Sequence, residues 1–433
     1  MMKKFIIIFF CTLCLFAKVN AQTFTEALKK AYEDNSELNA ERESINISQQ
    51  ELKVSRSAYL PTITLSGTQS KENTEKLTNQ SGGDARLDDV DPSDQSITIT
   101  QTLIDFGRKA ELEKSKIGLD LAKAKLLKKE QDILYKSIEA YTGLIAANEK
   151  FKINQSNVNL LDRQVETDRI RLERGQITLS DVAQSESSLA EAQAKLIQAE
   201  NNLLIGLLNY KNVIGEISDP ELLSKSSIIE TNLPGNLNSA IELSKKNNPD
   251  LKISEFEYQQ SKKDTSNAKS DLAPKATLSY DKTQTEDLSA TYDEREKDVL
   301  KATVTWPFYS GGKNMATFKK NQSLELQKSL LLDDMIKENQ TNVASAWSSY
   351  QSNQSLLNSV RSQVNAAEIA SEGILAEYNS GSNKRTTLEV IQSNSLLLDA
   401  QISLADSERN YILSQFNLLK SVGLLNSTYL KIK

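Results

Sequence analysis

The sequence predicts a mainly α-helical fold with a smaller β component, in which one unit of long coiled-coil helices and a strand pair is duplicated. Three observations predict this fold. The two halves of the chain share the same order of motifs, each half has a long stretch without proline, and four short segments alternate polar and apolar residues. We therefore expect long antiparallel helices and four β-strands per chain.

The first 21 residues are typical of a secretory signal peptide. Lys3 and Lys4 form a positive start, an apolar stretch of 13 residues follows, and positions 19–21 form a small-residue cleavage site. The apolar stretch is shorter than the about 20 residues that a membrane-spanning helix needs. We expect residues 1–21 to be removed, so that the mature chain begins at Gln22.

Residue types missing from the mature chain exclude most enzyme and metal-site chemistry. The sequence has no histidine, and its two cysteines, Cys11 and Cys14, both lie in the predicted signal peptide. Zinc sites and most nucleophilic hydrolases depend on one of these residue types. Carboxylate pairs remain in principle, but aromatic residues make up only 6% of the chain. We therefore expect that the protein is not an enzyme and that it has no metal or cofactor site.

Charge and hydropathy exclude two further classes of protein. The net charge is −6, and the three lysines of the signal peptide leave −6 − 3 = −9 for the mature chain, whereas nucleic-acid binding needs a basic face. After residue 21 no apolar run approaches 18 residues, which excludes a protein anchored by helices. Transmembrane strands remain open, because alternating residues score poorly on hydropathy.

The internal repeat sets the expected domain boundaries. The motif ALKKAYEDNSEL at residue 27 returns as AIELSKKNNPDL at residue 240, and DVAQSESSLAEAQ at residue 181 returns as EVIQSNSLLLDAQ at residue 389. A stretch with two prolines separates the halves. We expect a first repeat over 22–216, a linker over 217–236 and a second repeat over 237–433, each with helix, β-hairpin, long helix and returning helix.

The helices of the first half are expected over 23–58, 108–174 and 180–215, and the second half repeats them. The long helix, with 67 residues, would measure about 100 Å. Gly175 and Gly381 stand where a helix C-cap needs a left-handed residue, and mark the two tip turns. After each turn apolar residues recur every seven positions with small residues between them, which predicts close antiparallel coiled coils. The small residues are Ser185, Ala192, Ala199 and Gly206, then Ser393, Ala400, Ser407 and Ser414.

Four strands are expected at 62–68, 96–103, 276–282 and 300–306, paired as two antiparallel hairpins around polar loops at 71–95 and 281–298. Pro61, Pro274 and Pro307 mark the helix–strand junctions, where a missing N–H is tolerated. Four strands cannot close a barrel, and each unpaired backbone group at a sheet edge in lipid costs several kcal/mol. Several chains must therefore share one wall, and three copies would supply twelve strands.

The duplicated plan, the elements TLIDFGR and PFYSGGK near the second and fourth strands, and the DV-type tip turn resemble the TolC-type outer membrane efflux proteins. The resemblance covers essentially all of the mature chain. It implies a homotrimer whose twelve strands form one barrel in the bacterial outer membrane, continued by a helical tunnel across the periplasm. It also implies an exit duct for a tripartite efflux or type I secretion system. The partners would be a periplasmic adaptor (membrane fusion) protein, an inner-membrane pump and outer-membrane lipid, with no cofactor.

The same resemblance implies a gate where the coiled coils meet at the periplasmic tip. By position, Tyr378 and Arg385 match the family's tip tyrosine and arginine, which bond to the first-half coil around Ser180 and Asp181. Glu389 takes the place of a pore-constricting acid. On this interpretation, contacts from Tyr378 and Arg385 to Asp181 hold the tip shut. Alternatively, Arg385 and Glu389 form a solvated i,i+4 pair that contributes a few tenths of a kcal/mol.

A different class of protein also explains the coiled coils: a periplasmic adaptor or scaffold that forms no pore. Adaptors carry one helical hairpin flanked by compact β domains, whereas this chain has two hairpins and no such β-rich domain. The alternating strands favour the channel.

Overall fold

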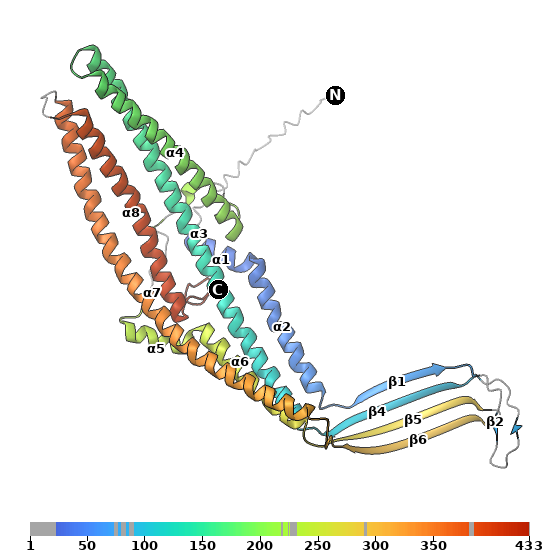
Figure 1. Ribbon diagram of the computed structural model, residues 1–433. Helices are drawn as coiled ribbons and strands as arrows, with labels where there is room; N and C mark the ends of the chain where they lie inside the picture. Colours follow the sequence, from blue (N-terminus) through green and yellow to red (C-terminus); the bar gives the residue numbers. More distant parts are fainter. Residues whose placement is uncertain are drawn as a thin grey trace, which may run out of the picture.

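The protein is a rod of long helices that carries a narrow four-stranded sheet at one end (Figure 1). The computed structural model describes residues 23–72, 77–78, 84–85, 91–217, 220–223, 225, 232–289, 292–380 and 385–432. The predicted signal peptide and Gly381 lie outside these residues. Within them the predicted fold class is confirmed, with long helices, four main strands and a duplicated order of elements.

The two halves contain matching elements. The first half has α1 (Phe24–Asp34), α2 (Ser36–Ser57), β1 (Thr62–Gln69), β4 (Ser93–Ile104), α3 (Gly107–Glu173) and α4 (Leu179–Val213). The second half has α5 (Leu237–Asn247), α6 (Pro249–Ser270), β5 (Lys275–Ser289), β6 (Tyr292–Thr305), α7 (Lys313–Asn379) and α8 (Thr387–Val422). The short strands β2 (Leu77–Thr78) and β3 (Asp84–Ala85) pair with each other, and η1 (Pro220–Leu222) lies between the halves. Both long helices, α3 and α7, have 67 residues.

The single helix expected over 23–58 is wrong, because the chain breaks at Asn35 into α1 and α2. Asn35 has an extended backbone, and its side-chain oxygen accepts a hydrogen bond from the N–H of Leu38 at 3.0 Å. An asparagine in this role caps the start of a new helix. Asn248 does the same before α6, where Pro249 takes the first helical position.

The polar loop expected over 281–298 is also wrong, because β5 and β6 continue through most of it. The two strands pair from Lys275 with Thr305 to Glu286 with Glu294. Both faces of this extension are largely polar, so it does not show the alternation of polar and apolar residues that predicts a strand. All four strands are antiparallel in the order β1-β4-β5-β6, which joins the two hairpins through β4 and β5.

Each long helix lies along shorter ones, as predicted. Helix α3 packs against α2 toward the sheet and against α4 toward the tip, while α7 packs against α6 and α8 in the same way. The predicted small-residue seam is confirmed at seven of its eight positions, by burial of Ser185, Ala192 and Ala199 in α4 and of Ser393, Ala400, Ser407 and Ser414 in α8. The eighth residue, Gly206, is half-buried. Small side chains allow the helix backbones to approach closely.

No helix among the described residues is both long enough and apolar enough to cross a membrane.

The main hydrophobic core lies midway along the rod, where the two halves meet. Phe24 of α1 contacts Tyr141 of α3 edge-on, with ring centroids 5.2 Å apart, and Phe416 of α8 at 5.8 Å. The C-terminal segment folds back onto this core and buries Leu425 and Leu430. Gly423 permits that reversal, because its φ is +84° and a Cβ there would lie 2.5 Å from the carbonyl carbon of Asn247.

Candidate functional site: the helical tip and the sheet

The helical tip is formed by the ends of α3 and α7 and the starts of α4 and α8, at the end of the rod away from the sheet (Figure 1). Its two helical hairpins are linked through Asp168 of α3, which is fully buried. The Tyr378 hydroxyl of α7 donates to Asp168 Oδ1 at 2.8 Å. Ser185 of α4 donates to Oδ2 at 2.6 Å, and Gln164 donates to Oδ1 at 2.9 Å. The buried carboxylate therefore has three side-chain donors, one of them from the second hairpin.

Tyr378 is the centre of the contact between the hairpins. Its hydroxyl also lies 3.0 Å from the Thr387 hydroxyl, and its ring lies 4.1 Å below the Arg171 guanidinium carbon of α3. Arg171 further donates to the Tyr378 carbonyl at 3.3 Å. Burial is the main cause that raises the pKa of the Tyr378 phenol, and the neighbouring Asp168 carboxylate raises it further. The hydroxyl therefore stays a donor at physiological pH.

The predicted contact to Asp181 is wrong within the chain. Asp181 is the third residue of α4, and its carboxylate accepts from the backbone N–H of Thr178 at 2.8 Å and the Thr178 hydroxyl at 2.7 Å. This reciprocal cap uses the carboxylate at the start of its own helix. Ser180 is exposed in the same turn. Tyr378 does reach the first-half hairpin, but through Asp168.

Arg385 and Glu389 contact each other, as in the alternative interpretation. Arg385 donates to Glu389 at 3.1 Å and to Glu377 of α7 at 2.7 Å, so both carboxylate partners belong to its own hairpin. Glu389 also completes a reciprocal cap with Thr386. The cap and Arg385 lower the pKa of the Glu389 carboxyl. A pore-constricting role for Glu389 needs three copies around one axis, and stays a prediction.

The first tip turn has the predicted glycine geometry. Gly175 has a φ of +67°, and it donates to the Leu172 carbonyl at 2.8 Å, while Gln176 donates to the Arg171 carbonyl at 2.9 Å. These two bonds satisfy carbonyls that the end of α3 would otherwise leave free. The second predicted turn residue, Gly381, lies outside the described residues.

Proline and arginine shape the junction between helices and sheet. Pro61 and Pro274 stand one residue before β1 and β5, and Pro307 follows β6 by two residues. The Arg108 guanidinium donates to the carbonyls of Ala58, Thr102 and Leu103 at 3.2, 2.9 and 3.1 Å. One side chain thus satisfies carbonyls from both the end of α2 and the end of β4.

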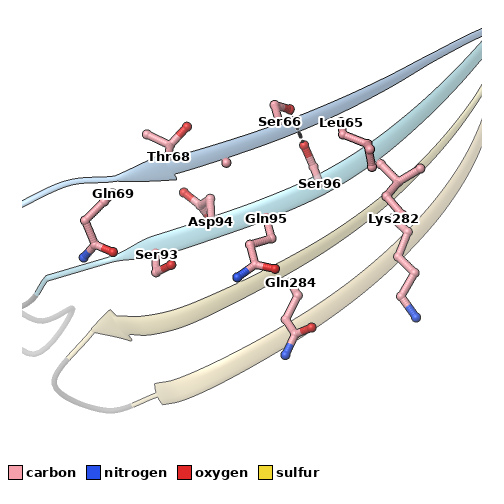
Figure 2. A pocket seen from close by; sticks show the side chains of 12 residues that line it. Leu65, Ser66, Thr68, Gln69, Ser93, Asp94, Gln95, Ser96, Lys282 and Gln284 are labelled. Carbon is pink, nitrogen blue, oxygen red and sulfur yellow. Dashed lines mark hydrogen bonds between the residues drawn. The ribbon is translucent and has the colours of Figure 1, made fainter. Parts of the chain in front are cut away.

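The sheet has two chemically different faces. On the apolar face, Ile63, Ile99, Tyr280 and Leu300 form one row across the four strands. On the polar face, the row beside it contains Thr62, Thr100, Ser279 and Lys301. Further from the helices the apolar face becomes polar, and Figure 2 shows Gln69, Gln95 and Gln284 there, with Ser66 and Ser96 hydrogen-bonded on the opposite face at 2.8 Å. Both faces are thus open to their surroundings, and the apolar one leaves Leu300 and Val304 each 72% exposed.

Comparison with known proteins identifies the family. The sequence model of the outer membrane efflux protein family matches residues 27–216 and 240–424. The chain belongs to the outer membrane efflux protein family. The resemblance expected from the sequence is confirmed, and so are the transport function and the outer-membrane location that go with membership.

Individual relatives resemble this outer membrane efflux protein over nearly its whole length. It is 24% identical to the outer membrane efflux protein BepC of Brucella suis over 415 residues, which cover 95% of this chain and 88% of BepC. It is 21% identical to the alkaline protease secretion protein AprF of Pseudomonas aeruginosa, covering 87% and 79%. The CmeC outer membrane channel of Campylobacter jejuni has the same fold, with a TM-score of 0.80, 13% identity and coverage of 93% and 86%.

Sequence reasoning missed Asp168, the acceptor at the tip. Asp168 and Tyr378 are 210 positions apart, and local spacing does not indicate their contact. The sequence does indicate the helix caps at the tip, because Thr178 with Asp181 and Thr386 with Glu389 both fit the T-x-x-D/E capping pattern. That pattern assigns both acids to their own helix starts.

Proposed function

We propose that three copies of this chain close a twelve-stranded barrel in the outer membrane and continue it as a helical tunnel across the periplasm. The observation that carries the proposal is the four-stranded sheet with two open edges, β1 and β6. An open edge in lipid leaves backbone N–H and C=O groups unpaired, at several kcal/mol each. Pairing β6 of one copy with β1 of the next removes every edge and keeps all neighbours antiparallel.

The two faces of the sheet fit a barrel wall. Lys301 lies between Leu300 and Ala302 on β6, so either the lysine or the two apolar residues face lipid. A lysine facing lipid near the bilayer midplane costs about 2–4 kcal/mol. The apolar face therefore turns to lipid, and the polar face, with its threonines, serines and Lys301, lines the lumen.

Aromatic residues and charges mark the membrane boundaries. At the helical end of the sheet, Trp306 and Phe308 are 59% and 84% exposed and contact each other edge-on, as expected for an interfacial girdle. At the other boundary, the Tyr280 hydroxyl donates to Asp298 at 3.0 Å, where charged residues begin on the lipid-facing side. From Trp306 to Asp298 the strand measures about 26 Å at 3.3 Å per residue, and a tilt of about 40° reduces this to about 20 Å across the membrane, within about 5 Å of the about 25 Å apolar band of such barrels.

The channel would serve as the exit duct of a tripartite efflux or type I secretion system. Its relatives include an outer membrane efflux protein and an alkaline protease secretion protein by name. A rod of this length places the tip deep in the periplasm, where an adaptor protein joins it to an inner-membrane pump. The repeat boundaries at 22–216 and 237–433, joined by the linker 217–236, are part of this proposal, as is removal of residues 1–21.

The tip would act as the gate. The Tyr378 to Asp168 bond joins the two helical hairpins of one chain, and Arg171 covers the same tyrosine. Opening the tip by moving the α7–α8 hairpin outward would break this bond together with the Arg171 contacts to Tyr378, because all of them join the two hairpins at that level. Three such links, one per protomer, would hold the closed state.

Reconstitution of the mature protein tests this function. It should require detergent for extraction, migrate as a trimer that heat converts to monomer, and form channels in a planar lipid bilayer. A protein that stays monomeric in water without surfactant and adds no conductance would instead be a pore-free scaffold.

A further inference from the structure

Lys225, which lies between the two repeats, joins the two helical hairpins. Its ammonium lies 2.6 Å from a carboxylate oxygen of Glu149 on α3 and also forms an ion pair with Glu408 on α8. The lysine side chain is 33% exposed, so salt screens these charges less than it would on an open surface. One cation therefore bridges a helix of the first half and a helix of the second.

The residues before Lys225 hold it against the first half. Two positions earlier, Leu223 is buried in the main hydrophobic core. Glu221 of η1 forms an ion pair with Lys152 of α3 at 2.6 Å, and η1 packs against α3. If the α7–α8 hairpin moved away from α3, Lys225 would therefore stay with α3, and its contact to Glu408 would be the one that breaks.

A second ion pair braces the same level from the other side. Lys150 of α3 pairs with Asp406 of α8 at 2.5 Å, and both residues line the cleft beside α4. Glu149, Lys225 and Glu408 line the cleft beside α7. The contact between α3 and α8 is thus held on both sides at this level, and we call these five residues the ionic joint.

The ionic joint lies much nearer to the main core than the tip does. Along α3, at about 1.5 Å per residue, Glu149 lies about 12 Å beyond Tyr141 of the core, and Asp168 lies about 40 Å beyond it. If the α7–α8 hairpin pivots at the core, the helices separate at the joint by about one third of the movement at the tip.

This geometry gives the two contacts different ranges. The 2.8 Å hydrogen bond between Tyr378 and Asp168 is lost when it lengthens by about 1 Å. An ion pair persists to about 4 Å, so the contact between Lys225 and Glu408 would last until the tip has moved about 5 Å. The tip bond would break early in the movement and the ionic joint late.

We infer that Lys225 sets how far the channel opens, by restraining the α7–α8 hairpin after the Tyr378 bond has released the tip. The inference rests on the proposed channel and its tip gate. Opening then has two stages: loss of the Tyr378 bond gives a narrow opening, and loss of the Lys225 bridge gives the wide one. Lys225 is a positioning residue, because it acts through α8 and not on the cargo.

Single-channel conductance in a planar bilayer tests this order. Lys225→Gln alone should leave the conductance near its wild-type value, because the Tyr378 bond still closes the tip. In a Tyr378→Phe background, Lys225→Gln should raise the population of the widest conductance level on the order of tenfold, since the trimer loses three partly buried bridges. Lys225→Arg in that background keeps the charge and should leave the widest level rare.

The chain supplies a matched control and a test against a merely structural role. Lys195→Gln removes an ion pair with Glu191 that lies within α4, at 2.8 Å, and should not change the widest level. In Lys225→Gln, Glu408 keeps Arg361 of its own hairpin at 3.4 Å. The temperature at which the trimer dissociates should therefore stay near its wild-type value. A structural role would lower that temperature and leave the widest level unchanged.

A cross-link gives the opposite perturbation and does not depend on Lys225→Gln assembling. Lys225→Cys and Glu408→Cys would be joined by a short bis-maleimide in the Tyr378→Phe background. Both native cysteines lie in the predicted signal peptide, so the mature chain offers the reagent only the two introduced thiols. The cross-linked channel should lose its widest conductance level and keep the narrow one.

Each result has one meaning. A widest level that neither Lys225→Gln nor the cross-link changes overturns the inference. Lys225→Gln alone opening the channel as much as Tyr378→Phe overturns the order of the two stages. Wild-type and Tyr378→Phe proteins that form no channel at all contradict the proposed function itself, whatever Lys225 does.

Discussion

Replacing Tyr378 by phenylalanine removes the hydroxyl that links the two helical hairpins and keeps the ring that Arg171 covers. A hydrogen bond to a charged group contributes about 1.5–3 kcal/mol, so one link is worth about 2 kcal/mol and three links about 6 kcal/mol. About 5.5 kcal/mol suffices to move a two-state equilibrium from 1:99 to 99:1. Asp168 keeps Ser185 and Gln164 as donors, so the fold should tolerate the change. We therefore expect a mostly closed channel to become mostly open.

The assay is single-channel conductance in a planar lipid bilayer, compared with two control variants. Tyr350→Phe removes a hydroxyl from the same helix, where Tyr350 stacks on Tyr411 of its own hairpin. Arg385→Ser removes a side chain whose carboxylate partners also belong to its own hairpin. Both should raise conductance less than Tyr378→Phe. Equal conductance in Tyr378→Phe and wild type would refute the gate assignment.

Three further predictions follow from the same structure. Because the pKa of Tyr378 is raised, the hydrogen bond from Tyr378 to Asp168 is at full strength below about pH 10 and is lost as the pH rises through the raised value. The conductance of the wild-type channel should therefore rise above about pH 10, and that of Tyr378→Phe should not. Gly423→Ala should destabilise the trimer by more than about 2 kcal/mol, because the backbone φ of Gly423 is +84° and an added Cβ would meet the backbone of Asn247. The temperature at which the trimer dissociates on a gel measures this effect, and Gly235→Ala, where an added Cβ meets open space, should leave that temperature unchanged. Arg108→Ala should speed proteolysis at the helix–sheet junction, because it removes hydrogen bonds to three carbonyls that contribute roughly 2–3 kcal/mol together. Arg108→Lys should restore only part of the resistance to proteolysis, because one ammonium group cannot replace the several donors of a guanidinium. Cleavage of Arg108→Ala as slow as that of wild type would argue that Arg108 does not stabilise the junction.

Local patterns in the sequence predicted the long elements well. The absence of proline and the heptad of small residues gave both helices of 67 residues and the buried seam at Ser185 and Ala400. Gly175 marked the end of α3 through its left-handed backbone. These features depend on residues near one another in the chain, so the sequence carries them directly.

Features that depend on distant residues, or on polar strands, were missed. The outer parts of β5 and β6 are held by pairing with each other and carry few apolar residues, so alternation gave no signal there. The break between α1 and α2 occurs because the Asn35 side chain caps the start of α2. The residues on both sides of Asn35 have helical periodicity, which predicts one continuous helix instead. The contact between Tyr378 and Asp168 at the tip depends on α7 lying beside α3, and no local pattern in the sequence indicates that arrangement.

The central claim is that β6 of one chain pairs with β1 of the next, and disulfide trapping tests it most directly. The only two cysteines lie in the predicted signal peptide, so introduced cysteines would be the sole thiols of the mature chain. Thr64→Cys on β1 would be combined in turn with Val299→Cys, Lys301→Cys or Thr303→Cys on β6, all on the polar face and at opposite edges of the sheet. The account predicts a covalent trimer on a non-reducing gel for at least one pair, lost on reduction. Monomer for every pair, from protein extracted from outer membranes, would contradict it.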